Sequence, residues 1–379
     1  MMEKIRLGDI ATTITKGTTP TTIGFPFVDT GINFVKIESI DEAGNFLPDR
    51  FAHITDECNR KLGRSKLEEN DILFSIAGAI GRTAIVTKSI LPANTNQALA
   101  IIRIPSNAIN LQFVLYALQS QAVAEQSAKQ KQGVAQLNLS LKNIADIQIP
   151  LVSSEKQAEI VRILAALDVT IGQRKEQIKF IDQLVKSRFI ELFGMPGTDA
   201  FGWGLVPLGS TCNINPKKSL DSRLVSGAMV SFVPMPAVTE HGEIDATAIK
   251  EYDEVKTGFT YFAENDVLFA KITPCMENGK GAVAKGLHNG IGFGSTEFHV
   301  LRPISGKTDP YWIYTLTAFS QFRMDAASNM TGSAGQRRVP ASFLENYRVS
   351  LPPIALQEQF AAFVEQTDKS KLAVQKGLQ

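Results

Sequence analysis

Segments of the first half of this 379-residue chain return in the second half, about 200 residues later. The matched segments keep their order along the chain, and their offsets stay between 195 and 202. They are Leu-Gly at 7–8 and 208–209, Phe-Val at 34–35 and 232–233, Asn-Asp-Ile-Leu-Phe at 70–74 and Asn-Asp-Val-Leu-Phe at 265–269, Ile-Pro at 149–150 and Leu-Pro at 351–352, Gln157 and Gln359, and Asp168 and Asp368. Because solenoid repeats are only about 20–45 residues long, one duplication of this size predicts two similar domains related by pseudo-twofold symmetry.

Each half is predicted to be a mixed α/β (α+β) domain. Short β-type runs separated by turn residues are followed by one helical stretch, in the same order in both halves. The runs are 33–37, 72–76 and 98–104 with a helix at 111–129, and then 230–233, 267–270 and 298–301 with a helix at 311–327. For the repeated Asn-Asp segments, a turn that feeds a buried strand is a better explanation than a binding site.

A long helix is predicted after the first domain, over residues 154–193. This stretch holds no proline and one glycine, Ser153 or Ser154 can cap its start, and the Gly-Met-Pro-Gly segment at 194–197 ends it. Apolar residues recur at alternating spacings of four and three, which is typical of a helix that packs lengthwise against another helix. The seam positions are Ile160, Leu164, Leu167, Ile171, Arg174, Ile178, Ile181, Val185, Arg188 and Leu192.

A second helix, predicted within residues 353–379, is shorter and has a poorer seam. Its seam positions are Phe360, Val364, Thr367, Lys371, Val374 and Leu378. By the match of Asp168 with Asp368, it lacks a counterpart of residues 180–194. In an antiparallel pair of helices, the start of the first helix, residues 155–167, then has no partner. We expect that stretch either to fray or to be covered by a partner chain.

Charge and cysteine content narrow the class of protein. Lys plus Arg total 39 and Asp plus Glu total 38, so no global field draws the chain to nucleic acid or to an anionic membrane. Any basic surface for DNA must therefore be local. Cys58, Cys212 and Cys275 lie too far apart for a cysteine-based metal site, and scattered thiols suit a reducing compartment. With no signal-peptide pattern and no membrane span in the sequence, we expect a cytoplasmic protein.

Several segments resemble catalytic motifs but lack the surrounding pattern that each motif needs. The glycine-rich segment 290–294 precedes a predicted strand instead of a helix, and Ser-Gly-Lys-Thr at 305–308 lacks the first glycine of a P-loop. Glu-Val-Lys at 254–256 lacks the Pro-Asp of a nuclease cluster, and the four histidines have no catalytic spacing. We therefore expect no catalytic residue and no metal ligand in the chain.

The order of these landmarks resembles the specificity subunit (HsdS) of type I restriction-modification systems. The segments that carry the resemblance are 7–10, 70–74 with Gly78, 150–160, 294–298 and 351–359. The resemblance implies target-recognition domains at 1–150 and 204–352. It also implies conserved spacer helices at 151–196 and, shortened, at 353–379, paired antiparallel as a coiled coil.

That family binds double-stranded DNA and docks two adenine-N6 methyltransferase (M) subunits together with restriction and translocase (R) subunits. AdoMet, ATP and Mg are then expected on the partners and no cofactor in this chain, which would recruit catalysis without performing it. The seam of the first helix would be a docking surface for a partner. A helix of about 40 residues spans roughly 60 Å, enough to separate two half-sites by about 34–36 Å, one turn of DNA. Two unlike domains imply an asymmetric bipartite target.

Candidate base and phosphate contacts are arginine, lysine, asparagine and glutamine in loops. Two loops aligned through Gly133 and Gly335 come first, because the one at 129–142 has no acidic residue and the other holds two arginines. Their candidates are Lys129, Lys131, Gln132, Gln136 and Asn138, then Arg337 and Arg338. Second choices are Arg82, Asn96, Gln97, Lys271, Lys280, Ser295 and Thr296. For each of these residues, an ordinary solvated surface role remains an equal alternative.

Two other functions remain open at this stage. Asp-Pro-Tyr-Trp at 309–312 is similar to the Asp-Pro-Pro-Tyr of adenine methyltransferases. The second proline and an AdoMet loop are missing, but a self-contained methyltransferase is the alternative enzyme. A duplicated protein-binding scaffold without DNA affinity is the third hypothesis.

Overall fold

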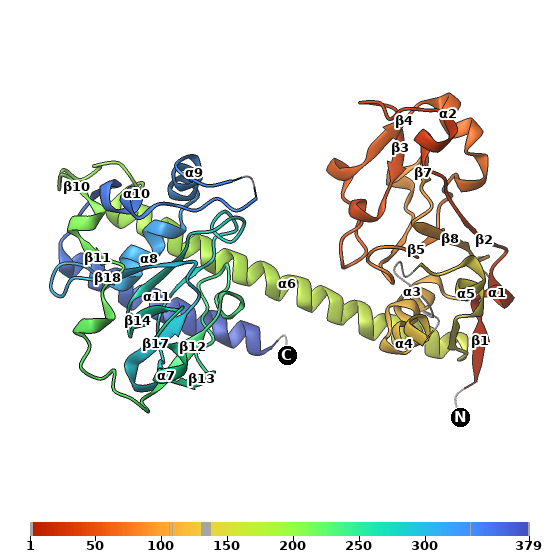
Figure 1. Cartoon of the computed structure of the whole chain (residues 1–379). Coiled ribbons are helices and arrows are strands. Elements are labelled where there is room, and N and C mark those ends of the chain that lie inside the picture. Colours follow the sequence, from red (N-terminus) through yellow and green to blue (C-terminus); the bar gives the residue numbers. More distant parts are fainter. Residues whose placement is uncertain (1–2, 106, 108, 130–137, 334, 378–379) are drawn as a thin grey trace. The chain divides into compact units, whose positions relative to one another are not determined.

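The computed structural model describes residues 3–105, 107, 109–129, 138–333 and 335–377 (Figure 1). The chain divides into two compact units, Met1–Thr170 and Ile171–Gln379. The division falls inside the longest helix, α6 (Ser154–Phe193). Each unit has its own hydrophobic core, so each is described separately.

Unit 1 is built on two β-sheets and a two-stranded ribbon. The first sheet is antiparallel throughout, whereas β3 and β7 of the second sheet run parallel. In sheet order the strands are β2 (Thr13–Lys16), β8 (Leu99–Arg103), β5 (Ile72–Ser75) and β6 (Thr83–Ile85); then β4 (Ala52–Ile54), β3 (Ile32–Val35) and β7 (Ala93–Thr95); and the ribbon β1 (Lys4–Arg6) with β9 (Gln148–Pro150). The helices are α1 (Leu7–Ile10), α2 (Asp56–Lys61), α3 (Leu111–Gln119), α4 (Gln121–Lys129) and α5 (Leu141–Asp146).

Unit 2 repeats this topology, with one more strand in its second sheet. In sheet order its strands are β11 (Cys212–Ile214), β18 (Phe298–Pro303), β15 (Val267–Ala270) and β16 (Gly281–Val283); then β13 (Ile249–Glu251), β12 (Met229–Val233), β17 (Ile291–Gly294) and β14 (Thr260–Ala263); and the ribbon β10 (Leu205–Pro207) with β19 (Arg348–Ser350). Its helices are α7 (Tyr252–Val255), α8 (Pro310–Ala318), α9 (Ser320–Ser328), α10 (Ala341–Asn346) and α11 (Ile354–Lys376). The mixed α/β class and the two similar domains are therefore confirmed.

Towards the end of each half, equivalent residues of the two units lie 200 positions apart in the sequence. This offset corrects two of the matches that the sequence comparison gives. Pro150 pairs with Lys4 as Ser350 pairs with Leu205, so Pro150 corresponds to Ser350 and not to Pro352. Gln157 accepts a hydrogen bond from the N–H of residue 110 (3.0 Å) and donates one to the carbonyl of residue 152 (2.9 Å).

Gln357 makes the same two bonds in unit 2, with the N–H of Asp309 (2.9 Å) and the carbonyl of Pro352 (2.8 Å). The match of Gln157 with Gln359 is therefore wrong. The second half has glutamines at both 357 and 359, and only the hydrogen bonds distinguish which one anchors its helix.

The repeated Asn-Asp segments form the turn that their sequence predicts. Asn70 and Asn265 have positive φ angles of 72° and 67°, a region that asparagine tolerates better than most residues. The carboxylates of Asp71 and Asp266 each accept a bond of 2.7 Å from the backbone N–H three residues earlier. Strands β5 and β15 then follow with every residue buried. Packing and turn formation, and not binding, account for this motif.

Each aspartate of the repeated turn also holds an arginine from the neighbouring strand. Arg103 Nε and Nη2 contact the two oxygens of Asp71 at 2.7 and 2.8 Å, and Arg302 contacts Asp266 in the same way at 2.7 and 2.6 Å. Both carboxylates are buried, whereas about 30% of each arginine side chain remains exposed. The duplicated fork ties β5 to β8 and β15 to β18.

The single helix expected at the end of each α/β domain is interrupted. Ser120 separates α3 from α4, and Phe319 separates α8 from α9, each with extended backbone angles. The hydroxyl of Ser120 donates to the carbonyl of Ala117 and accepts from the N–H of Val123, which ends one helix and begins the next. Phe319 instead buries its ring 5.2 Å from that of Phe189. Both breaks come with side-chain contacts that a periodicity argument does not register.

Helix α6 has the bounds that the sequence predicts. Ser153 accepts a bond from the N–H of Lys156 (3.4 Å), and Gly194, with a φ of 78°, closes the helix through a bond to the carbonyl of Ile190. Within unit 2, α6 packs along α11 (Figure 1).

The α6 and α11 pairing in unit 2 is antiparallel. The rings of Phe189 and Phe193 lie 5.5 and 5.4 Å from that of Phe360, near the start of α11, and Asp182 binds Lys371 at 2.9 Å towards its end. The α11 seam is buried at Phe360, Val364, Thr367 and Lys371, as predicted, and Leu378 lies outside the described residues.

The α6 seam is buried only in part. Val185 and Leu192 pack on the unit 2 core, but the most buried α6 side chains there, Phe189 and Phe193, lie off the predicted seam. Leu167 and Ile171, on the seam, are exposed. The stripe is displaced because α6 of unit 2 packs against the domain core as well as against α11.

We predict that Asp71→Asn destabilises unit 1 by about 3 kcal/mol, because it leaves the buried end of the Arg103 fork uncompensated. Glu68→Gln is the matched control, since Glu68 contacts the same arginine (2.6 Å) but is 63% exposed. An exposed pair of this kind contributes less than about 1 kcal/mol. Amide hydrogen exchange of β5 and β8 measures both. Equal acceleration by the two variants would show that the fork does not hold the sheet.

Candidate nucleic-acid interface

One edge of unit 2 gathers five of the predicted DNA-contacting residues. Three segments meet there: the end of β15, the turn between β17 and β18, and residues 336–339. We call the set the basic edge; its members are Lys271, Ser295, Thr296, Arg337 and Arg338.

Backbone hydrogen bonds hold the three segments together. The N–H of Lys271 donates to the carbonyl of Glu297 (2.9 Å), and its own carbonyl accepts from the N–H of Val339 (2.9 Å). Arg338 exchanges two backbone bonds with Thr331, at 2.8 and 2.9 Å. The loop that carries the arginines is therefore fixed by the main chain, independently of its side chains.

The sequence prediction missed Glu297, the one acidic residue of this cluster. Arg338 Nε and Nη2 contact its two carboxylate oxygens at 2.8 Å each, and Arg338 Nη1 donates to the carbonyl of Gln336 at 3.2 Å. Arg338 holds the pKa of the Glu297 carboxyl below its usual range, and Glu297 raises the pKa of the arginine. Burial lowers the pKa of Lys271, an effect that Glu297 opposes and Arg338 reinforces.

A buried histidine supports the same edge from below. His299 Nε2 lies 2.8 Å from the carbonyl of Val339, and its Nδ1 lies 3.0 Å from the amide nitrogen of Asn215. Burial lowers the pKa of His299, so the neutral ring is favoured. The ring thus links the first strand of the sheet to the loop that bears Arg338.

The same backbone pattern recurs in unit 1 with different side chains. The N–H of Ile76 donates to the carbonyl of Ala98 (2.9 Å), and the carbonyl of Ile76 accepts from the N–H of Leu139 (2.9 Å). Ile76, Ala98 and Leu139 therefore correspond to Lys271, Glu297 and Val339. Asn138 in turn corresponds to Arg338. The alignment through Gly133 and Gly335, which sets Gln136 opposite Arg338, is wrong by two residues.

The remaining unit 1 candidates fall at matching places. Asn96 Oδ1 accepts from the N–H of Ala98 (3.0 Å), as Ser295 Oγ accepts from that of Glu297 (3.2 Å), so both shape the turn. Gln97, the counterpart of Thr296, accepts a bond from the hydroxyl of Thr19. Lys129 and Asn138 are exposed, and Lys131, Gln132 and Gln136 lie outside the described residues.

Arg82 and Lys280 are counterparts whose contacts are internal. Arg82 Nη1 donates to the carbonyls of Ile37 (3.2 Å) and Ile40 (2.8 Å), and Lys280 Nζ lies 3.5 Å from the carbonyl of Met235. These contacts join the hairpin after β5 or β15 to the segment after β3 or β12. Both cations are therefore engaged with their own domain.

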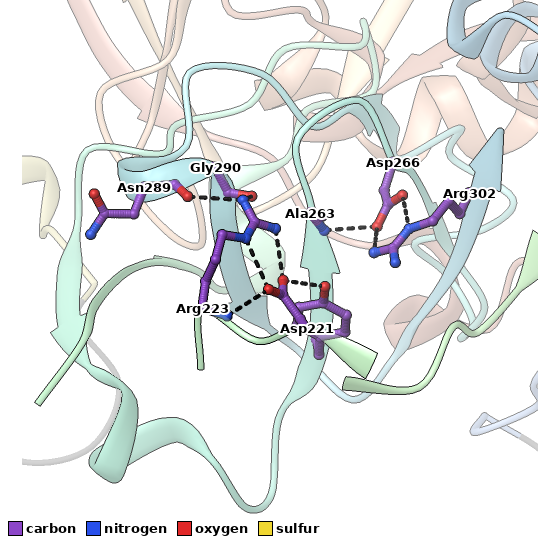
Figure 2. A network of polar contacts seen from close by, with 8 residues as sticks. Asp221, Arg223, Ala263, Asp266, Asn289, Gly290 and Arg302 are labelled. Carbon is purple, nitrogen blue, oxygen red and sulfur yellow. Dashed lines mark hydrogen bonds and ion pairs between the residues drawn. The ribbon is translucent and has the colours of Figure 1, made fainter. Parts of the chain in front are cut away.

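A third arginine fork in unit 2 has no signal in the sequence (Figure 2). Arg223 contacts both oxygens of Asp221 at 2.9 and 2.7 Å and donates to the carbonyls of Asn289 and Gly290, while the hydroxyl of Tyr261 donates to Asp221 at 2.7 Å. Arg223 holds the pKa of Asp221 far below its usual range. The fork fastens the loop before β12 to β14 and β17.

Two of the segments that resemble catalytic motifs have structural explanations. Residues 291–294 form the buried strand β17, where a side chain at Gly292 would meet the ring of Phe262. Asp309 caps helix α8 by accepting from the N–H of Tyr311 (2.8 Å), and burial raises its pKa. Trp312 is buried in the unit 2 core.

The part of the chain that the structure describes was found to hold neither a candidate metal cluster nor a membrane-spanning helix. No group of three or more histidine, cysteine, aspartate or glutamate side chains there could hold a metal ion. No helix in those residues is both long and apolar enough to cross a bilayer.

Some residues of the predicted docking seam on α6 pack on a domain core, and others are half-buried or exposed. Ile160 packs on the unit 1 core, Val185 and Leu192 on that of unit 2, and Arg188 pairs with Glu191 at 2.8 Å. Leu164, Arg174, Ile178 and Ile181 are half-buried, and Leu167 and Ile171 are exposed.

Comparison with known proteins decides the family. The model of the type I restriction modification DNA specificity domain matches residues 1–181 and again residues 202–379. The chain belongs to this family. The two matches fall on the two halves of the duplication, so each unit carries one specificity domain.

Individual relatives of the specificity family agree with this assignment. Over 153 residues the chain is 43% identical to the specificity subunit of the type I restriction enzyme EcoEI of Escherichia coli; the match covers 40% of this chain and 25% of that relative. It therefore spans a quarter of the relative's length.

Solved structures share the fold. A chain from a type I R-M system, studied for its complex assembly and conformational transition, aligns with a TM-score of 0.53 and 19% identity, over 99% of this chain and 92% of that one. The S subunit of a type I restriction-modification system from M. genitalium aligns with a TM-score of 0.50 and 14% identity, over 100% and 92%.

We predict that unit 2 loses stability as the pH falls below about 6.5, the ordinary pKa of histidine. The folded-state pKa of His299 is lowered, so the unfolded chain binds the proton more readily and acid favours unfolding. Above that pH the contribution is fully present. Tryptophan fluorescence reports unit 2, because both tryptophans, Trp203 and Trp312, lie in it.

The unfolding midpoint of the His299→Gln variant should change less between pH 8 and pH 5.5 than that of the unaltered chain. His288→Gln, at an exposed histidine of the same unit, is the control and should leave the change intact. An unaltered pH profile in the His299 variant would contradict the prediction.

Proposed function

We propose that this chain is the DNA-recognition subunit of a type I restriction-modification complex, and that each unit reads one half of an asymmetric bipartite site. The observation that carries the proposal is the pair of equivalent edges. Both are built on the same backbone bonds, but one presents Lys271, Arg337 and Arg338 where the other presents Ile76 and Asn138. A shared frame with different side chains suits two domains that read different bases.

The chain acts, in this proposal, without catalysis of its own. Adenine-N6 methylation would belong to M subunits that use AdoMet. Cleavage and translocation would belong to R subunits that use ATP and Mg. The complex would work in the cytoplasm, where its DNA substrate lies. The specificity family and the printed description of the Escherichia coli relative support these assignments.

A partner surface is proposed on helix α6. Large apolar side chains are exposed along it, and neither core of the described residues covers them. They are Ile163, Leu167, Val169, Ile171, Phe180 and Leu184. Exposed apolar surface of this kind is typical of protein–protein contacts, and an M subunit is the partner that the family supplies.

The methyltransferase alternative has lost its main support, because Asp309 caps helix α8 and Trp312 is buried. Methyl transfer by the purified chain alone would nevertheless restore it. The scaffold alternative predicts no DNA affinity at any salt concentration, whereas phosphate contacts make log K fall linearly with log salt.

We predict that the double variant Arg337→Ala/Arg338→Ala relaxes one half-site and leaves the other intact. The reciprocal control, Asn138→Ala, should relax the opposite half-site, since Asn138 occupies the place of Arg338 in unit 1. Base-resolution mapping of methylated adenine, in cells that carry the chain with its M partner, measures both. If either variant lost recognition of both half-sites, the proposal that each unit recognises one half-site would be wrong.

We predict that residues 163–173 of α6 exchange their amide hydrogens faster than residues 185–193 in the isolated chain. The second segment is the internal control, because Phe189 and Phe193 are buried in the unit 2 core. Addition of the M partner should slow the first segment alone. Full protection of residues 163–173 without a partner would count against the docking surface.

A further inference from the structure

The Glu297–Arg338 fork is an unusual feature for a surface that contacts DNA. A carboxylate repels phosphate, so an acidic residue at the centre of the basic edge weakens any general attraction to the DNA backbone. Glu297 nevertheless lies within 2.8 Å of two nitrogens of the most firmly held cation of this edge. The position of Glu297 therefore indicates that it orients the Arg338 side chain, and not that its charge attracts DNA.

The fork leaves a particular part of the guanidinium available. Arginine has five N–H groups in a fixed plane. Among contacts with described residues, Glu297 takes Nε–H and one N–H of Nη2, and the carbonyl of Gln336 takes one N–H of Nη1. One N–H therefore remains on each terminal nitrogen. Donors on the two terminal nitrogens of an arginine are suited to the O6 and N7 acceptors that guanine presents in the major groove.

Both the backbone and the partner of Arg338 are fixed before any ligand binds. The loop is held by two bonds to Thr331 and by the Val339 contacts with Lys271 and His299. The Arg338 side chain is 42% exposed while the Glu297 side chain is 24% exposed, so the arginine projects and the glutamate lies behind it. A side chain that is already ordered loses little conformational freedom on binding.

Unit 1 has the same backbone frame but none of the three charged side chains of this arrangement. Ala98 stands at the place of Glu297, Asn138 at the place of Arg338, and Ile76 at the place of Lys271. The pair is therefore specific to one half of the duplication, which is where a residue that sets one half-site should be found.

We propose that Arg338 reads a guanine in the half-site of unit 2 and that Glu297 is a positioning residue that aims its two terminal donors at that base. The proposal rests on the proposed function, since it names the base that unit 2 recognises. Lysine cannot replace arginine here, because its ammonium is a point charge without a planar fork.

The test is selection of randomised duplex DNA by the full chain, followed by sequencing of the bound fraction. Arg338→Lys keeps the charge and should lower the preference for guanine at one position by about 10- to 100-fold, the range of a bidentate contact. Glu297→Gln should lower it at the same position by up to about 30-fold, the equivalent of about 2 kcal/mol of arginine rotamer freedom. Preferences in the other half-site should not change.

Arg223→Lys is the matched control. Arg223 forms the same kind of fork with Asp221 in the same unit, and its side chain is 49% exposed. Its substitution should leave the selected sequence intact. Tryptophan fluorescence melting of each variant verifies that unit 2 is folded under the selection conditions.

Three outcomes would decide against the proposal. Enrichment of no sequence by the unaltered chain would overturn the proposed function and this inference together. A bipartite motif that Arg338→Lys leaves unchanged would overturn the inference alone and assign Arg338 to phosphate. An equal loss in Arg223→Lys would show that the effect arises from a general disturbance of unit 2.

Discussion

The main-chain bonds that join three segments at one edge of each unit are the constraint on which the rest of the structure depends. In unit 2 they run from Glu297 to Lys271 and from Lys271 to Val339, and in unit 1 from Ala98 to Ile76 and from Ile76 to Leu139. Since backbone N–H and carbonyl groups are the same in every residue, this frame survives any exchange of side chains that does not introduce proline. The edge can therefore change its chemistry while the fold is retained.

The Asp–Arg forks lie at the other end of the same strand pairs, β5 with β8 and β15 with β18, and they differ from this edge in what the duplication keeps. Asp71 with Arg103, and Asp266 with Arg302, are duplicated side chain for side chain, because a buried carboxylate tolerates no change that leaves it without a partner. The fork of Glu297 with Arg338 uses the same geometry at a half-exposed place and occurs once. Duplicated forks thus hold the sheets, and the unduplicated fork at the edge is free to serve recognition.

The sequence predicted most of the architecture because the duplication is visible in residues that the fold cannot change. Asn70 and Asn265 adopt positive φ angles, Asp71 and Asp266 are buried, and Leu7 and Leu208 are fully buried at matching places. The alignment of the two halves was wrong where two residues of the second half were equally plausible matches. Gln357 and Gln359 are the same residue type, and only the hydrogen bonds of Gln357 to Asp309 and Pro352 show which one corresponds to Gln157.

The candidate site was harder to predict for a physical reason. Residue type alone favours Arg82 and Lys280 as much as Arg337, although the donors of Arg82 and Lys280 point to carbonyls of their own domain. The same criterion excludes every acidic residue, Glu297 among them. A charge-based search favours residues that attract phosphate everywhere, whereas base recognition needs a donor pair at a fixed angle. That angle depends on a partner behind the arginine, and the partner best suited to hold a guanidinium plane is a carboxylate. Acidic residues among the basic ones are therefore compatible with DNA recognition by a chain whose net charge is only +1. At this edge, the Glu297 carboxylate would orient Arg338 so that the arginine recognises one base.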